Sequence, residues 1–236
     1  MGNFALKWEK FMHAMFDNGG YETVLLGLRN TVLVAVVGLV IGIVIGTVLA
    51  AVEVMPKYKR LPRVLDKICR LYVAFFRGTP LVVQLLVGYF VLRPLLGLPI
   101  SALASCMIIY GMNSGAYVSE IMRSGIQSVD PGQMEAGRAV GLGYWTVMAH
   151  VVIPQAIKNI LPTLGNEFIA LIKDTSIVSF VGTSDLYVAF KFIGTNNYEF
   201  MVPYLVMAVI YIVLVALISL GIKLMERSLK KSDRRK

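Results

Sequence analysis

The sequence predicts an all-α integral membrane protein with five transmembrane helices, an outer N-terminus and a cytoplasmic C-terminus. Three observations predict this class. Of the 236 residues, 57% are hydrophobic and only 16% are charged, whereas a soluble domain has about 45–50% apolar and about 25% charged residues. The apolar residues lie in long uncharged runs. Lys and Arg gather in a few segments, as expected for cytoplasmic loops.

Hydropathy alone indicates four spanning helices. Residues 31–52, 95–119 and 201–222 contain no charged side chain. At about 1.5 Å per residue, each run is long enough as a helix to cross a hydrocarbon core of roughly 30 Å. Residues 81–92 form a shorter run, which gains length from the apolar residues 71–76 before it.

The distribution of basic residues predicts the topology. One cluster follows the first run, one lies within residues 123–158, and one forms the tail, whereas the segment between the second and third runs carries only Arg93. If all three clusters are cytoplasmic, an even number of crossings must follow Lys158. Residues 201–222 supply one, so the other is predicted within residues 160–184. The clusters comprise Lys57, Lys59, Arg60, Arg63, Lys67 and Arg70; Arg123, Arg138 and Lys158; and Lys223, Arg227, Lys230, Lys231, Arg234, Arg235 and Lys236.

Three segments follow from this topology: an outer amphipathic segment (1–20), a transmembrane domain (21–222) with a cytoplasmic loop (123–158), and a basic cytoplasmic tail (223–236). The first segment places apolar side chains on one helical face, which is typical of a helix on a membrane surface. A short disordered tail is the alternative. The face consists of Phe4, Trp8, Phe11, Met12 and Met15.

Small residues mark two further features. Gly38, Gly42 and Gly46 recur every four residues in the first run and predict close packing against another helix, of this chain or of a second one. The sequence Arg77-Gly78-Thr79-Pro80 predicts a break in the second helix, because proline disfavours helical geometry at the residue before it.

Several function classes are not supported. The chain has no G-x-x-x-x-G-K-[ST] phosphate loop, so we expect no ATP hydrolysis by this chain. Its histidines, His13 and His150, form no H-E-x-x-H motif, and Cys69 and Cys106 have no paired spacing. We therefore expect no catalytic residue, metal or cofactor here. The net charge of +9 is assigned to membrane topology and not to nucleic-acid binding.

Ionisable residues in the predicted fourth helix mark a candidate site. Glu167 and Asp174 are seven residues apart and share nearly one helical face. Such groups in a membrane normally face a bundle interior or a wet cavity, so a role in lining a polar path is favoured. An internal salt bridge with Lys173, or a helix end near the headgroups, is the alternative. Asn113 in the third helix is a further candidate, and Thr79 is a weaker one.

The cytoplasmic loop is too regular for a simple linker. We expect one helix from Glu135 to Val140, an interruption at Gly141 and Gly143, and a second short helix over residues 144–151 that stops before Pro154. Two short helices joined by a glycine elbow are typical of a docking element. A plain helical connection is the alternative.

This loop resembles that of ABC importer permeases, whose pattern is E-A-A, three residues, G, nine residues, then I-x-L-P. Residues 77–80, 115–120, 161–169 and 173–176 look like the polar amino-acid permeases of that family, so the resemblance covers nearly the whole chain. It implies the type I (MetI-like) importer permease fold in a bacterial cell membrane. The loop matches at Glu135, Ala136, Gly141 and Pro154 and departs at Gly137, Val151 and Ile153.

The resemblance also implies partners. Two permease copies or paralogues would work on two ATPase subunits that bind ATP and Mg²⁺, and an external binding protein would deliver an amino acid. The loop residues Glu135, Ala136, Gly137, Gly141 and Pro154 would couple the permease to the ATPase.

The substrate path would use the candidate residues named above. Glu167 and Asp174 would receive an ammonium or a cationic side chain, and Asn113 the substrate carboxylate, unless Asn113 makes an interhelical hydrogen bond. Two acidic groups favour arginine, lysine or histidine. A glutamine or other polar amino-acid permease of the same family is the alternative. An ion-coupled secondary transporter is a remote one, because it would not need the docking loop.

Overall fold

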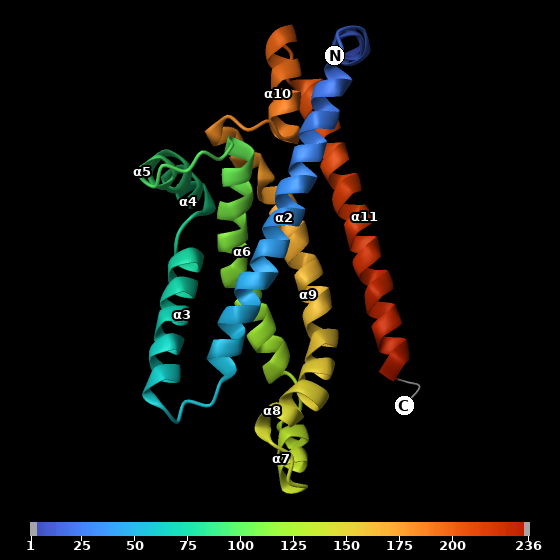
Figure 1. Cartoon of the computed structure of the whole chain (residues 1–236). Coiled ribbons are helices and arrows are strands. Elements are labelled where there is room, and N and C mark those ends of the chain that lie inside the picture. The colour runs from blue at the N-terminus through green and yellow to red at the C-terminus, as the bar shows by residue number, and fades with distance from the viewer. Residues whose placement is uncertain (1–3, 234–236) are drawn as a thin grey trace. The chain divides into compact units, whose positions relative to one another are not determined.

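A computed structural model describes residues 4–233, and all regular structure in that range is helical (Figure 1). Residues 1–3 of the predicted outer segment and 234–236 of the predicted tail lie outside the described range. The elements are α1 (Phe4–Met12), η1 (His13–Asp17), α2 (Gly20–Val54), α3 (Arg60–Gly78), α4 (Leu81–Val87), η2 (Gly88–Leu92), α5 (Arg93–Leu95), α6 (Ala102–Gln127), α7 (Pro131–Ala139), α8 (Tyr144–Val147), η3 (Met148–Val152), α9 (Ile153–Asp174), η4 (Thr175–Val181), α10 (Leu186–Asn197) and α11 (Met201–Asp233).

Length and composition identify several candidate membrane spans. The helices α2 and α11 are each long and apolar enough to cross, and two bent pairs raise the number of candidates to four. One pair joins Arg60–Gly78 to Leu81–Leu95 at 105°, and the other joins Tyr144–Val181 to Leu186–Asn197 at 56°. The remaining predicted crossing, residues 95–119, overlaps α6, whose 26 residues include several polar side chains that lower its mean hydropathy. The number five and the orientation stay predictions.

The predicted break in the second helix is confirmed. Helix α3 ends at Gly78, and α4 begins at Leu81 after the Thr79-Pro80 pair. Thr79 has extended backbone angles (φ −123°, ψ 145°). Its hydroxyl donates a hydrogen bond to the Phe75 carbonyl at 2.8 Å. That bond satisfies one of the carbonyls that a helix end leaves without a partner.

The second short helix of the loop does not end where the sequence predicted. Helix α8 continues through the π-helical turn η3 into α9, so the chain stays helical past Pro154. The prediction of a stop before Pro154 is wrong. Pro154 is the second residue of α9 and directly follows the π-helical turn η3. Local π-helical adjustments of this kind satisfy the backbone groups that a proline inside a helical run would leave without a partner.

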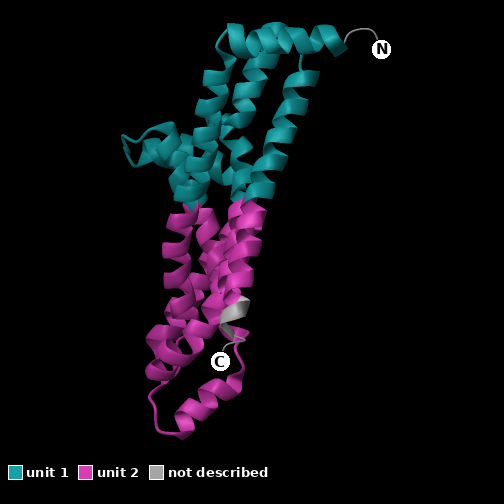
Figure 2. Cartoon of the chain, turned by 90° about the vertical axis from the view of Figure 1, so that its right-hand side faces the viewer, with its two compact units in different colours: residues 1–38, 81–110, 170–217 teal, residues 39–80, 111–169, 218–236 magenta. Residues whose placement is uncertain are grey.

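The chain divides into two compact units, shown in teal and magenta in Figure 2. Unit 1 comprises residues 1–38, 81–110 and 170–217, and unit 2 comprises residues 39–80, 111–169 and 218–236. The division cuts across four long helices, α2, α6, α9 and α11, each of which contributes to both units.

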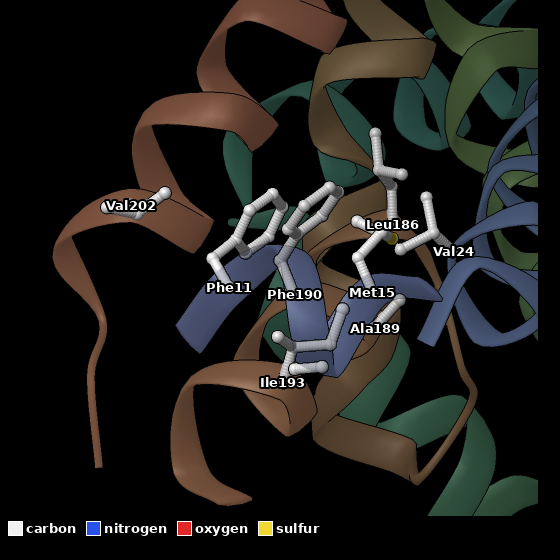
Figure 3. Packing of buried hydrophobic residues seen from close by; sticks show 9 residues of the cluster. Phe11, Met15, Val24, Leu186, Ala189, Phe190, Ile193 and Val202 are labelled. Carbon is white, nitrogen blue, oxygen red and sulfur yellow. The ribbon is translucent and has the colours of Figure 1, made fainter. Parts of the chain in front are cut away.

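Unit 1 has an apolar core in which α1 and η1 pack on α10 (Figure 3). Phe11 and Met15 are 5% and 8% exposed, and they lie among Leu186, Phe190 and other residues of α10. Of the face predicted for the membrane surface, Phe4, Trp8 and Met12 are exposed. The predicted face therefore serves two roles: Phe11 and Met15 pack on α10, and the other three side chains are exposed.

In unit 2 the predicted glycine face of α2 packs on α6 of the same chain. A Cβ atom at Gly42 would lie 2.7 Å from the Ser114 hydroxyl oxygen, and one at Gly46 would lie 2.6 Å from a methyl carbon of Val118. The packing is reciprocal, since a Cβ at Gly115 would lie 2.7 Å from Ile45. The open question of the partner helix is thus resolved for Gly42 and Gly46.

The close approach of α2 and α6 is testable at Gly46. We expect Gly46→Ala to lower the melting temperature of the purified protein, because the added Cβ would also meet the Ser119 backbone nitrogen at 2.8 Å, and backbone cannot rotate away. Overpacking of this kind costs about 1–3 kcal/mol. Gly221→Ala is the matched control, since a Cβ there meets nothing within 4 Å. Equal melting temperatures for the two variants would contradict the packing.

Candidate functional site

The acidic residue predicted in the fourth helix is anchored in unit 2. Glu167 lies in α9 and is partly buried. The hydroxyl of Ser114, a fully buried residue of α6, donates a hydrogen bond to Glu167 Oε1 at 2.9 Å. Ser114 is not among the residues that the sequence pattern predicted. The signal available was a hydroxyl next to Asn113 within an apolar run.

Two other predicted residues lie on or beside the end of α3. Asn113 is 7% exposed, and its Nδ2 donates to the Phe76 carbonyl at 3.4 Å. A second hydrogen bond joins the same turn of α6 to α3, since the Tyr72 hydroxyl donates to the Met112 carbonyl at 2.6 Å. Thr79 ends the same helix. The bond from Asn113 is the interhelical hydrogen bond that was its alternative role, and its contact with a substrate stays a prediction.

Asp174, the fourth predicted residue, belongs to unit 1. It is the last residue of α9, and it is exposed. Its backbone carbonyl accepts a hydrogen bond from the buried Tyr110 hydroxyl at 2.6 Å. Glu167, Asn113 and Thr79 all belong to unit 2. Glu167 is hydrogen-bonded to Ser114, the residue that follows Asn113 in α6.

The loop predicted to dock has a well-defined first helix. Pro131 begins α7, and the Asp130 carboxylate caps it by accepting from the Gly132 N–H at 2.8 Å. Glu135 and Ala136 lie on its exposed surface. Because the helix is capped and its outer face is exposed, it can present these side chains to another molecule.

The glycine elbow has a specific backbone geometry. Gly141 has φ +86°, in the region that favours glycine, and the Arg138 guanidinium donates to the Leu142 carbonyl across the turn at 3.0 Å. Gly137 packs on α8, since a Cβ there would lie 2.6 Å from a methyl carbon of Val147. This contact explains why glycine stands where the family pattern has its second alanine. Pro154 is exposed in the first turn of α9.

The loop is also attached to the end of α2. The Tyr144 hydroxyl donates to the Val54 carbonyl at 3.0 Å. Val140 is 77% exposed and Trp145 is 58% exposed, so large apolar side chains flank the elbow on the surface of unit 2. Such a combination of apolar surface and defined backbone is typical of an interface.

Comparison with known proteins identifies the family. The model of the binding-protein-dependent transport system inner membrane component matches residues 38–231 of this chain. The chain belongs to that family. It is a multi-pass inner membrane protein and a permease subunit, and it is not itself catalytic. A binding-protein-dependent transporter of the ABC class also has an ATPase and a binding protein as partners. The predicted importer membership is confirmed.

Curated relatives agree with this assignment. A protein of Rickettsia bellii (strain RML369-C), to which the role of glutamine transport system permease protein GlnP is provisionally assigned, is 37% identical over 88% of this chain and 91% of its own length. The arginine transport system permease protein ArtQ of Bacillus subtilis (strain 168) is 41% identical over 69% of this chain and 74% of its own length.

Solved structures confirm the predicted MetI-like permease fold. A crystal structure of an amino acid ABC transporter with histidines has a chain 38% identical to the permease, with a TM-score of 0.81 over 88% of this chain and 94% of that one. An inward facing structure of the MetNI methionine ABC transporter is 20% identical, with a TM-score of 0.73 over 88% of this chain and 96% of that one. The second likeness concerns the fold alone.

The geometry of the elbow predicts a strained variant. Gly141→Ala should destabilise the turn by about 1–2 kcal/mol, because its φ of +86° is costly for a residue with a Cβ. We expect faster trypsin cleavage after Arg138 in the folded permease, with cleavage in the tail as the internal reference. Gly143→Ala is the control, since that residue has φ −65° and a Cβ there would lie 3.7 Å from its nearest neighbour. Identical cleavage rates would refute the strain.

Proposed function

We propose that the permease carries polar amino acids into the cell, with basic ones favoured, and that Glu167 receives the positive charge of the substrate. The observation that carries the proposal is the hydrogen bond from Ser114 to Glu167 Oε1 at 2.9 Å. This bond holds the Glu167 carboxylate between α6 and α9, two helices that are predicted to cross the membrane. Ionisable groups at such positions are costly and are typical of transport paths.

The chemistry of the site fits an amino acid. An ionised carboxylate can accept about four hydrogen bonds, and an ammonium or a guanidinium is the kind of donor that it binds most strongly. Asp174, Asn113 and Thr79 remain part of the proposed path. Asn113 is its weakest member, because its amide already donates to the Phe76 carbonyl.

The names of the relatives support the class of substrate. Glutamine, arginine and histidine are the amino acids in the printed names of the relatives and of the more similar structure. Two acidic groups on one helix favour a cationic side chain over the glutamine amide. Glutamine is the second candidate, because the Rickettsia protein matches nearly the full length of the permease.

The coupling loop supports a role in energy transfer. In this proposal α7 sits on the ATPase, with Glu135 and Ala136 at the contact, Gly137 and Gly141 setting the angle of the elbow, and Pro154 starting the helix that leads to Glu167. Two ATPase subunits would bind ATP and Mg²⁺. A second permease copy or paralogue, an external binding protein and the lipid bilayer complete the assembly, with residues 1–20 outside, 21–222 spanning and 223–236 in the cytoplasm.

Binding of labelled arginine and glutamine to the purified permease–ATPase complex tests the site. We expect the wild-type complex to bind arginine, and we expect Glu167→Gln to weaken that binding about 10- to 100-fold, as for loss of a charged hydrogen bond worth about 1.5–3 kcal/mol. Glu9→Gln removes the same charge from an exposed residue of α1 and is the matched control.

The two substrates separate the candidates. Glutamine binding without arginine binding would select the second candidate. Arginine binding that is the same in Glu167→Gln and in the wild type would remove Glu167 from the substrate path.

Charge reversal on α7 tests the coupling role. We expect Glu135→Arg to abolish most uptake in reconstituted vesicles while arginine binding is unchanged, because the side chain is exposed and lies on a capped helix. Glu9→Arg serves as the control for added charge. Normal uptake by Glu135→Arg would argue against the docking of α7 on the ATPase.

A further inference from the structure

A pocket of about 450 Å³ lies in unit 2, between the end of α3, the second half of α6 and the first half of α9. Apart from Ile121 and Gly125, its lining is charged, aromatic or hydrogen-bonding, which is unusual within a helical membrane protein. The polar lining residues are Arg77, Tyr117, Glu120, Ser124, Ser128, Asn159 and Thr163.

The pocket continues the polar face on which Glu167 lies. Asn159, Thr163 and Glu167 are spaced by four residues in α9 and therefore lie on one face of that helix. Thr163 lines the pocket, and Glu167 is one helical turn further on, about 6 Å along the axis at 1.5 Å per residue. The Asn159 amide donates to the Ser128 hydroxyl at 2.8 Å and joins α9 to α6 at the other end.

Two opposite charges stand together in this pocket. Arg77 Nη1 lies 3.7 Å from Glu120 Oε2, beyond the usual N–H···O range of about 2.7–3.2 Å. The Arg77 guanidinium also lies 5.6 Å from the centre of the Tyr117 ring. Its side chain is 45% exposed. This loose pairing leaves the planar guanidinium able to accept a second anion, and a carboxylate is the group that its fork fits best.

Glu120 is held from its other side. Arg123 Nη2 donates to Glu120 Oε2 at 2.6 Å, and Arg123 Nε lies 3.7 Å from Glu53, whose side chain is only 5% exposed. Arg123 also donates to the Gln127 side chain at 3.1 Å. Glu120 is therefore fixed by α6 and α2, whereas its contact with Arg77 is long. The Glu120 carboxylate keeps lone pairs for an ammonium donor.

We propose that Arg77 and Glu120 form a second docking site on the path, where Arg77 binds the α-carboxylate and Glu120 the α-ammonium group of the transported amino acid. The proposal rests on the proposed function, since it takes an amino acid as the substrate. The zwitterionic end is common to all α-amino acids. The site therefore recognises the α-amino and α-carboxyl groups of the substrate, while Glu167, one turn beyond Thr163 along α9, binds the positive charge of its side chain.

The alternative role for Arg77 is purely structural, as an ion pair that joins α3 to α6. The two roles differ in what they predict for a ligand without a carboxylate. Agmatine is arginine without its α-carboxylate, and it keeps the guanidinium. A docking site loses affinity for arginine only, whereas a structural defect weakens both ligands alike.

The experiment measures equilibrium binding of labelled arginine and agmatine to the permease–ATPase complex in lipid nanodiscs. We expect Arg77→Gln to weaken arginine binding about 10- to 100-fold, as for a charged hydrogen bond of about 1.5–3 kcal/mol, and to leave agmatine binding unchanged. Arg63→Gln is the matched control. Arg63 lies on the same helix and is exposed, and its Nε donates to the Lys59 carbonyl at 3.4 Å, away from the residues that line this pocket. If glutamine is the ligand bound, 4-aminobutanamide takes the place of agmatine.

The outcomes separate the two proposals. Equal losses for both ligands, or no loss for either, in Arg77→Gln would overturn the docking site. Glu167→Gln should weaken arginine and agmatine together, because both carry the guanidinium. If Glu167→Gln has no effect while Arg77→Gln still discriminates the two ligands, the role proposed for Glu167 fails and the docking site stands.

Discussion

The close packing of α2 on α6 is the constraint on which the candidate site of unit 2 depends. A Cβ at Gly42 would come within 2.7 Å of the Ser114 hydroxyl, the group that donates to Glu167. The missing side chain at residue 42 therefore leaves space for this hydroxyl beside α9. Without a driving force from water exclusion in the bilayer, such small-residue contacts and interhelical hydrogen bonds are what hold membrane helices together.

The partly buried carboxylates of Glu53, Glu120 and Glu167 in unit 2 each have a polar or charged partner, because a charged group that is buried without one is costly. Glu167 has a hydroxyl partner in α6. Towards the coupling loop, Glu53, Glu120 and Arg123 form a network in which each carboxylate faces a guanidinium. Pairing of this kind offsets the desolvation cost of charged groups. In the proposed function, the substrate path at Glu167 and the end of the coupling loop would lie on one helix, α9.

Some residues of the candidate site could be identified from sequence, and others could not, because their contacts depend on distant parts of the chain. Glu167 was identifiable because a charge in an apolar helix is rare, and the break at Thr79 because Pro80 follows it. Ser114 was not, since a serine in an apolar run is common and its partner lies 53 residues away. The helical run through Pro154 was also missed, because the sequence pattern does not reveal the π-helical turn η3 that accommodates this proline. Arg77 and Glu120 were visible only as parts of a motif.

The sequence by itself determined the all-helical membrane class, the break in the second helix and the family, since hydropathy, proline geometry and the loop motif are local properties. Tertiary structure decided which residues meet. It assigned the glycines of α2 to α6, turned Phe11 and Met15 onto α10, and set Arg77 beside Glu120. These outcomes depend on contacts between segments far apart in the chain, and a periodic pattern on one helix specifies a face but not the partner that covers it.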